Sequence, residues 1–137
     1  MLNTDSSDTR PRLRILIVED EALIRWAVAE ALTGAGHHVI EAADAATARR
    51  LVAETTEPLD AVLLDLRLPD SSDLSLLSTI RQDTPTTAVV MMTAHGTRED
   101  ATNAKALGAF EVVEKPFDVH HIEQLVVAAC RARRSAR

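Results

Sequence analysis

The sequence contains very few aromatic residues and almost no cysteine. Aromatics make up 2% of its 137 residues, with one Trp, two Phe and no Tyr, so an aliphatic core is expected. The single cysteine, Cys130, has no partner for a disulfide within the chain, which suggests a reducing compartment. Cys130 falls on an apolar helical face and is expected to be an inert core residue.

Long apolar runs and an excess of positive charge are also missing. No run approaches the roughly 20 apolar residues that span a bilayer, and the polar start of the chain lacks a signal segment. A cytoplasmic location without a membrane partner is therefore expected. The net charge of -6 argues against direct binding to nucleic acid, because phosphates favour Lys and Arg. The basic end, CRARRSAR, is expected to be a solvated helix end or the start of a linker.

Two hydrophobic periodicities alternate along the chain. Short runs of apolar and β-branched residues predict buried strands, at residues 13–18, 38–42, 61–65, 87–93 and 109–114. Stretches with apolar residues at helical spacing predict helices, at residues 21–36, 44–55, 73–82, 97–108 and 118–133. Asp44 is a plausible N-cap of the second helix, and Asp73 or Ser72 of the third. Trp26, on the first helix, is expected to have a packing role.

Five strands alternating with five helices predict an α/β domain with helices on both faces of a sheet. Right-handed crossovers leave few topologies, and the economical one is a doubly wound, flavodoxin-like parallel sheet of order 2-1-3-4-5. The domain is expected to span residues 13–131, between a flexible tail at 1–12 and a basic tail at 132–137. In such sheets ligands bind beyond the carboxyl ends of the strands, beside the first strand.

Polar residues collect at that edge of the predicted sheet. Glu19 and Asp20 follow the first strand, Asp65 ends the third, Thr93 ends the fourth and Lys115 follows the fifth. Clustered carboxylates favour a hard cation, and Mg²⁺ is the best candidate. A hydroxyl and an ammonium opposite the metal suit a phosphoryl group, and a carboxylate can accept one as an aspartyl phosphate. Each residue alone has a structural explanation, as a cap, a loop or a strand end, but their shared edge favours a site.

Four motifs in this order, ILIVEDE, LLDLRLPD, VVMMTAHG and EKPFD, resemble the receiver domain of two-component response regulators over about residues 13–131. The resemblance implies that Asp65 is the phosphoacceptor and that Asp20 binds Mg²⁺ or Mn²⁺ directly. It also implies that Glu19 acts through water and that the backbone carbonyl of Arg67 is a third protein ligand.

The remaining site residues follow from the same resemblance. Thr93 resembles the switch hydroxyl, Lys115 the charge partner of the phosphoryl group, and Lys115–Pro116 is expected to be a cis peptide. The donor would be a sensor histidine kinase or a histidine phosphotransfer protein. The surface of the fourth helix, fifth strand and fifth helix would then change, to control a downstream partner, an output domain or a homodimer. Such a domain is not an enzyme acting on other molecules.

The sequence departs from the family pattern at two positions. Val112 stands where many receivers have Tyr or Phe, and it is expected to change little on phosphorylation; Phe110 is expected on the same face. Asp73 stands where glycine is usual, and Asp tolerates such backbone better than most residues. Arg67 and His95 either overhang the phosphoryl group or are simply exposed.

Other functions fit less well. A phosphorylation-independent interaction module with the same fold is the main alternative. A flavin or nucleotide protein is opposed by the acidic VEDEA after the first strand, which repels phosphate unless a metal is present. A phosphatase would need a second acid near the nucleophile, where this chain has arginine. The adjacent pairs His37–His38 and His120–His121 do not face one site, so solvated histidines are expected there.

Overall fold

The structure, a computed structural model, describes residues 12–71 and 73–135. The expected flexible tail at 1–12 therefore lies outside the described residues except for Arg12, and so do the last two residues of the expected basic tail. The first four residues of that basic tail continue the last helix, which ends at Ser135. Within the described part of the chain, no helix is long and apolar enough to cross a membrane.

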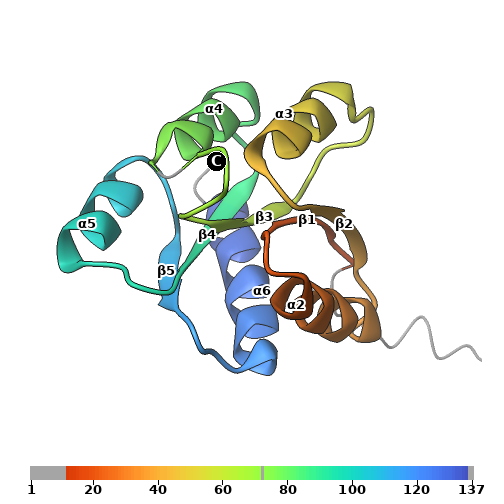
Figure 1. The fold of residues 1–137 in the computed structure, drawn as a ribbon. Coiled ribbons are helices and arrows are strands. Elements are labelled where there is room, and N and C mark those ends of the chain that lie inside the picture. The colour runs from red at the N-terminus through yellow and green to blue at the C-terminus, as the bar shows by residue number, and fades with distance from the viewer. Residues whose placement is uncertain (1–11, 72, 136–137) are drawn as a thin grey trace, which may run out of the picture.

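A five-stranded parallel sheet forms the centre of the molecule (Figure 1). Its strands are β1 (Arg14–Val18), β2 (His38–Ala42), β3 (Ala61–Asp65), β4 (Ala88–Thr93) and β5 (Glu111–Glu114). The order is β2-β1-β3-β4-β5, and every neighbouring pair is parallel. The predicted doubly wound topology is thus confirmed, and the carboxyl ends of all five strands lie at one edge.

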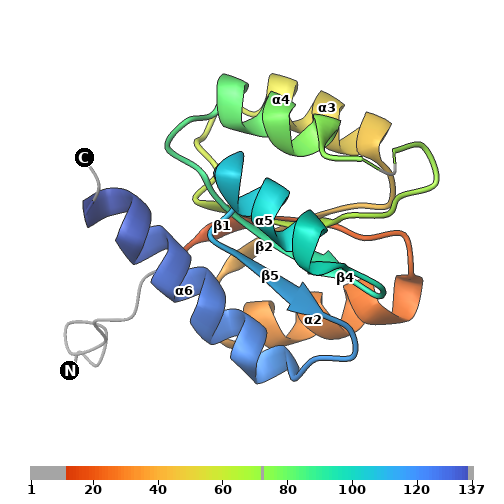
Figure 2. The ribbon, with the colours of Figure 1, turned by 90° about the vertical axis from the view of Figure 1, so that its left-hand side faces the viewer.

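Five helices cover the two faces of this sheet. They are α2 (Ala22–Gly34), α3 (Ala45–Glu54), α4 (Ser75–Asp83), α5 (Arg98–Ala106) and α6 (Val119–Ser135). Figure 2 shows α3 and α4 above the sheet and α2 and α6 below it. α5 joins the upper layer, because its Ala104 belongs to the same buried cluster as α3 and α4.

Strand alternation divides the core into two halves. In β1, Leu16 and Val18 pack toward α3 and α4, whereas Ile15 and Ile17 pack toward α2 and α6. All four side chains are fully buried. Each such burial stabilises the fold by about 1.5–3 kcal/mol. Because both faces are covered, the strands read as continuous apolar runs and not as alternating ones.

Side chains that precede α3 and α4 accept hydrogen bonds from N–H groups in the first turns of these helices. Asp44 caps α3 as predicted, since its side chain accepts a hydrogen bond from Thr47 N at 2.7 Å. The N-cap of α4 is Leu74, so the prediction of Asp73 at that position is wrong by one residue. Asp73 still accepts from Ser75 N at 3.0 Å, and Ser72 lies outside the described residues.

Two expectations about burial are wrong. Trp26 is 62% exposed on α2. His37 is buried: its Nδ1 accepts a hydrogen bond from Leu13 N at 3.1 Å, and its Nε2 lies 2.9 Å from a carboxylate oxygen of Glu123. Because Nδ1 accepts, Nε2 carries the proton and donates it to Glu123. Cys130 is buried as expected, and burial raises the pKa of its thiol to about 11.

Candidate functional site at the carboxyl edge of the sheet

The topology brings the predicted site residues together. β1 and β3 are neighbours, so Glu19 and Asp20, which follow β1, lie beside Asp65, the last residue of β3. One carboxylate oxygen from each of these three residues lies within 4.8 Å of the others. Glu19 and Asp65 are buried, and Asp20 is exposed. The cluster therefore has a buried base and an open rim.

Lys115 places one positive charge among these carboxylates. Its Nζ lies 2.6 Å from Glu19 Oε1, 2.9 Å from Asp65 Oδ2 and 3.3 Å from Glu21 Oε1. Burial lowers the pKa of Lys115, but hydrogen bonds and charge from Glu19 and Asp65 outweigh it, so the net shift is upward. Lys115 is therefore positively charged at any physiological pH.

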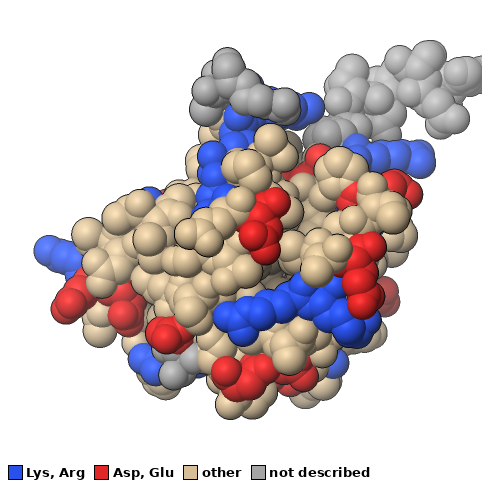
Figure 3. All heavy atoms as spheres, turned by 90° about the horizontal axis from the view of Figure 1, so that it is seen from above, with Lys and Arg blue, Asp and Glu red and all other residues tan. Residues whose placement is uncertain are grey.

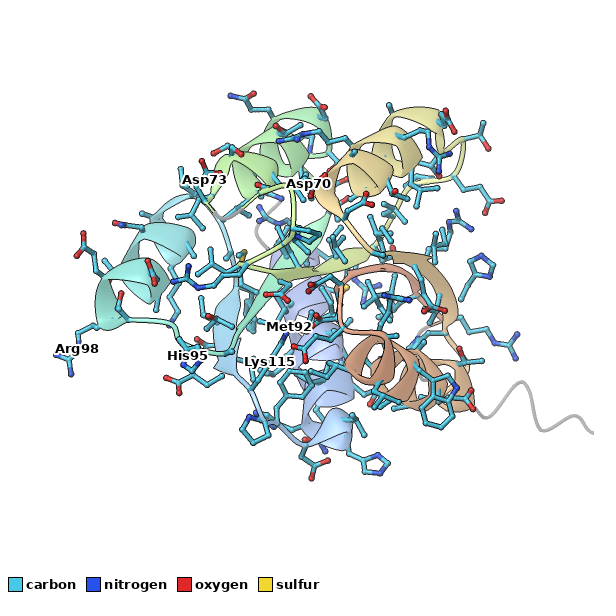
Figure 4. The ribbon with its side chains drawn as sticks, viewed as in Figure 1. Asp70, Asp73, Met92, His95, Arg98 and Lys115 are labelled. Atoms are coloured by element: carbon cyan, nitrogen blue, oxygen red, sulfur yellow. The ribbon has the colours of Figure 1, made fainter. Side chains whose placement is uncertain are left out.

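The backbone around Lys115 explains why its side chain reaches the cluster. Lys115 N donates to the carbonyl of Thr93 at 2.8 Å, which holds the residue after β5 against the end of β4. The bond from Lys115 to Pro116 is cis, as the resemblance implied. In Figure 4, Lys115 lies toward the centre of the molecule, between α2 and β5.

Glu19 is the most deeply buried carboxyl of the site. Its exposed fraction is 0%, and burial raises its pKa to about 7, although Lys115 and the N–H of Glu21 act in the opposite direction. Oε2 accepts from Glu21 N at 3.0 Å. Oε1 has no hydrogen bond of good geometry within the described residues, despite the close Lys115 ammonium. Buried oxygens are normally hydrogen-bonded, so this one favours a further positive partner.

Asp65 uses both of its oxygens. Oδ2 accepts from Lys115, and Oδ1 accepts from the backbone N–H of Arg67 at 3.0 Å. The residue is 4% exposed, so only a small part of it is accessible to a reactant. The side chain of Arg67 is exposed. The role of the Arg67 carbonyl stays a prediction.

Thr93 closes the β4 side of the site. It is 1% exposed, and its Oγ1 accepts from His95 N at 3.3 Å. A Cβ added to Gly96 would collide with Cγ2 of Thr93, so the loop after β4 passes very close to the hydroxyl-bearing side chain. His95 is exposed and lies toward α5 (Figure 4). A movement of the Thr93 side chain would therefore displace this loop.

The donor set fits a hard divalent cation. All the available ligand atoms are carboxylate oxygens, the type that Mg²⁺ and Mn²⁺ prefer. Glu19, Asp20 and Asp65 lie close together, so a cation would relieve the repulsion between their carboxylates. An open rim at Asp20 leaves space for the waters that Mg²⁺ retains.

Two residues near the site were assigned no role by the sequence reasoning. Glu21 is a third carboxylate partner of Lys115. Arg25 donates to the backbone carbonyl of Glu19 at 2.7 Å, while its Nε pairs with Glu41 at 3.2 Å. Arg25 thereby holds the acidic turn in place. Its position four residues after Glu21, one turn into the helix, is the signal that could have revealed it.

The aromatic position of the family pattern is occupied by an aliphatic side chain. Val112 is half-buried and packs against the core on the α3 and α4 side. Phe110 lies just before β5, and its N–H donates to the carbonyl of Val89 in β4 at 2.8 Å. It also lines a hollow with Ala129 and Ala132 of α6. That Phe110 shares the face of Val112 stays a prediction.

Comparison with known proteins gives consistent matches. The family model described as the response regulator receiver domain matches residues 15–127. Response regulator protein PilR of Pseudomonas aeruginosa is 39% identical over 122 residues, which cover 89% of this chain and 27% of PilR. The DNA-binding transcriptional regulator NtrC of Klebsiella pneumoniae is 39% identical over 112 residues, or 80% of this chain and 23% of NtrC.

Solved structures agree with these matches. The crystal structure of NtrX from Brucella abortus has a TM-score of 0.83 and 32% identity, and the match covers 93% of this chain and 28% of NtrX. The chain therefore spans about a quarter of the length of PilR, NtrC and NtrX.

Proposed function

Because this chain belongs to the response regulator receiver domain family, we propose that Asp65 accepts a phosphoryl group from a phosphohistidine donor. The observation that carries the proposal is the position of Lys115 Nζ. It lies 2.9 Å from Asp65 and 2.6 Å from Glu19, in a cluster that also contains Asp20. A lysine and three carboxylates at the carboxyl edge of such a sheet suit a metal-assisted phosphoryl transfer.

The residues that would hold Mg²⁺ or Mn²⁺ are Glu19, Asp20, Asp65 and the backbone carbonyl of Arg67. Asp20 and Asp65 would bind directly, and Glu19 would act through water. A bound cation would neutralise charge on the phosphoryl oxygens. The fit of the carboxylate cluster to a hard cation supports this assignment.

Transfer is a single displacement at phosphorus. A carboxylate oxygen of Asp65 forms the new bond to phosphorus, the bond from phosphorus to the donor nitrogen breaks, and that nitrogen leaves with the electron pair. Lys115 stabilises the charge on the transferring group, because its ammonium already lies against Asp65. The hydroxyl of Thr93 then donates to a phosphoryl oxygen.

The donor would be a sensor histidine kinase or a histidine phosphotransfer protein. An apolar groove beside the site supports docking there: Leu23, Ile24 and Phe117 line it together with Lys115 and Pro116. Leu23 is 82% exposed and Trp26 62%. They lie three residues apart on α2, so together they form an apolar patch of the kind that marks a partner surface. The domain acts as a phosphoacceptor in signalling and not as an enzyme on other molecules.

Phosphorylation would change the surface formed by α5, β5 and α6. Thr93 contacts the loop that leads into α5, and Leu107 and Phe110 expose apolar surface between α5 and β5. A downstream protein, an output domain or a second copy of the chain would bind this surface. The receiver domain would span residues 13–131 and work in the cytoplasm. It would bind no nucleic acid itself, because the net charge of -6 of the chain does not favour binding to phosphates.

The test is phosphorylation by a small-molecule phosphodonor with Mg²⁺, followed by intact-protein mass spectrometry. The expected result is a gain of one phosphoryl group that disappears with EDTA and in Asp65→Asn. Asp60→Asn is a matched control, because Asp60 lies just before β3, at the end of the strand opposite Asp65. The Asp60→Asn variant should be phosphorylated normally. No gain in the wild-type protein would support a phosphorylation-independent interaction module instead.

A further inference from the structure

The loop between β3 and α4 is tied to the start of a different helix by one side chain. Asp70 Oδ1 accepts from Ala45 N at 2.8 Å, and Asp70 Oδ2 accepts from Ala46 N at 3.0 Å. These are the first two residues of α3, whose N–H groups have no partner within the helix. The hydrogen bonds from Ala45 and Ala46 lower the pKa of Asp70, so its carboxylate is charged. Figure 4 shows Asp70 beside α3.

α3 also has a local N-cap. Asp44, the residue before α3, already accepts from Thr47 N at 2.7 Å. Asp70 adds a second carboxylate at the same helix end, from 24 and 25 residues away along the chain. Arg49 offsets part of this negative charge, and Figure 3 shows acidic and basic side chains side by side on this face. The contact therefore joins two elements and is more than a local cap.

The loop that Asp70 anchors begins at the phosphoacceptor. Leu66 N donates to Met92 O at 2.9 Å, and Arg67 N donates to Asp65 Oδ1 at 3.0 Å. Leu68 and Ser71 exchange two backbone hydrogen bonds, of 2.8 and 3.3 Å, which close a turn with Asp70 inside it. Residues 65–71 thus form one braced segment, and Asp70 links its tip to α3.

We propose that Asp70 is a positioning residue for the phosphorylation site. Its clamp on α3 holds the loop so that the carboxylate of Asp65 and the backbone of Arg67 are in place before the cation and the phosphoryl group arrive. This inference rests on the proposed function, because it assigns the braced loop to that site. The clamp has a consequence in the metal-free protein as well, namely slow opening of the Leu68–Ser71 turn.

The experiment compares Asp70→Ala with Asp44→Ala. Both variants remove one carboxylate from the same end of α3, but only Asp70→Ala frees the loop. Amide hydrogen exchange at Leu68 and Ser71 is measured in EDTA, and the Mg²⁺ dissociation constant is measured by calorimetry. In Asp70→Ala both loop amides should exchange faster, and the Mg²⁺ dissociation constant should rise about tenfold, as is typical when support of a metal site is lost.

The control should behave differently. Asp44→Ala should speed exchange in the first turn of α3 while leaving the loop amides and the Mg²⁺ dissociation constant unchanged. Asp70→Asn, which keeps one acceptor oxygen, should fall between the wild type and Asp70→Ala. Asp70 is exposed and fills no core space, so these variants should fold; circular dichroism checks this.

Three results would overturn the proposal: equal effects of Asp70→Ala and Asp44→Ala, unchanged loop exchange in Asp70→Ala, or faster loop exchange with an unchanged Mg²⁺ dissociation constant. Failure of the proposed function is a separate outcome. In that case the wild-type protein itself binds no Mg²⁺ and gains no phosphoryl group, and the positioning role falls with it, while faster loop exchange in Asp70→Ala would still identify a structural clamp.

Discussion

At the scale of single residues, the site is organised around a shortage of positive charge. Lys115 is the one cation paired with Glu19, Glu21 and Asp65 in the described part of the chain. Glu19 carries the largest electrostatic cost, because it has no exposed surface and its pKa is raised to about 7 from 4.5. Because burial disfavours the ionised form of Glu19, the free energy of unfolding depends on pH.

Glu19→Gln should remove that dependence in the metal-free protein. Between pH 4.5 and about 7 the folded chain holds a proton on Glu19 that the unfolded chain has lost. The free energy of unfolding therefore falls as pH rises through this window. Measured by urea denaturation in EDTA, the wild type should lose about 2–3 kcal/mol relative to Glu19→Gln between pH 5 and 8, since one pKa unit is worth about 1.4 kcal/mol and most of the shift from 4.5 to about 7 falls within this range.

Glu30→Gln, at an exposed position on α2, controls for the loss of one negative charge at the surface. A constant difference between Glu19→Gln and the wild type across the pH range would mean that Glu19 is ionised at no cost in the folded protein. The electrostatic account of the site would then be incorrect.

At the scale of elements, α5 depends unusually strongly on its cap. Ala104 is its one buried residue, so packing contributes little to its stability. Its start has a capping box: Thr97 Oγ1 accepts from Asp100 N at 3.0 Å, and Asp100 Oδ2 accepts from Thr97 N at 3.2 Å. A helix that is held mainly by its cap, with little buried surface, can move when Thr93 moves, because few core contacts have to be broken.

Thr97→Ala should therefore destabilise α5 locally. The expected cost is about 1 kcal/mol, the usual value for losing an N-cap hydroxyl. Amide hydrogen exchange should show about fivefold faster opening of α5, with little change in the strands. Thr97→Ser keeps the hydroxyl and should behave like the wild type. If Thr97→Ala speeds exchange equally in α5 and β4, α5 unfolds only with the whole domain.

The elements and the site edge could be predicted from sequence because both follow from local patterns. Apolar runs marked the strands, and parallel topology then placed Asp20, Asp65, Thr93 and Lys115 at one edge. Contacts between distant residues left no such pattern. Nothing local connects His37 with Glu123, which lie 86 residues apart and meet where β2 begins beside α6.

Asp70 illustrates the same limit. Its place after Pro69 gives no sign of a distant partner, yet Asp70 bonds the start of α3. The N-cap of α4 was misplaced because Asp73 bonds Ser75 N from one residue earlier than a standard cap. Side-chain reach across a loop, and not propensity, determines such contacts.

At the scale of the whole molecule, the two-sided core fixes the distance between strand ends. β1 and β3 are paired and buried on both faces, so the backbone segments that carry Glu19, Asp20 and Asp65 cannot separate. The fold therefore holds three carboxylates close together at this edge, and a bound cation would reduce their repulsion. Global stability should respond to the metal, because a ligand that binds only the folded state stabilises it.

Mg²⁺ should raise the thermal midpoint of the metal-free protein. At a concentration ten times its dissociation constant, binding adds about 1.4 kcal/mol, which corresponds to about 4–6 °C for a domain of this size. The measurement is calorimetry in EDTA and then in excess Mg²⁺, with NaCl at matched ionic strength as the control. Asp20→Asn should lose most of the Mg²⁺ effect but keep the response to NaCl. Equal shifts with the two salts would mean that ions only screen the acidic edge, and the cation site, with the phosphoryl transfer that depends on it, would have no support from stability.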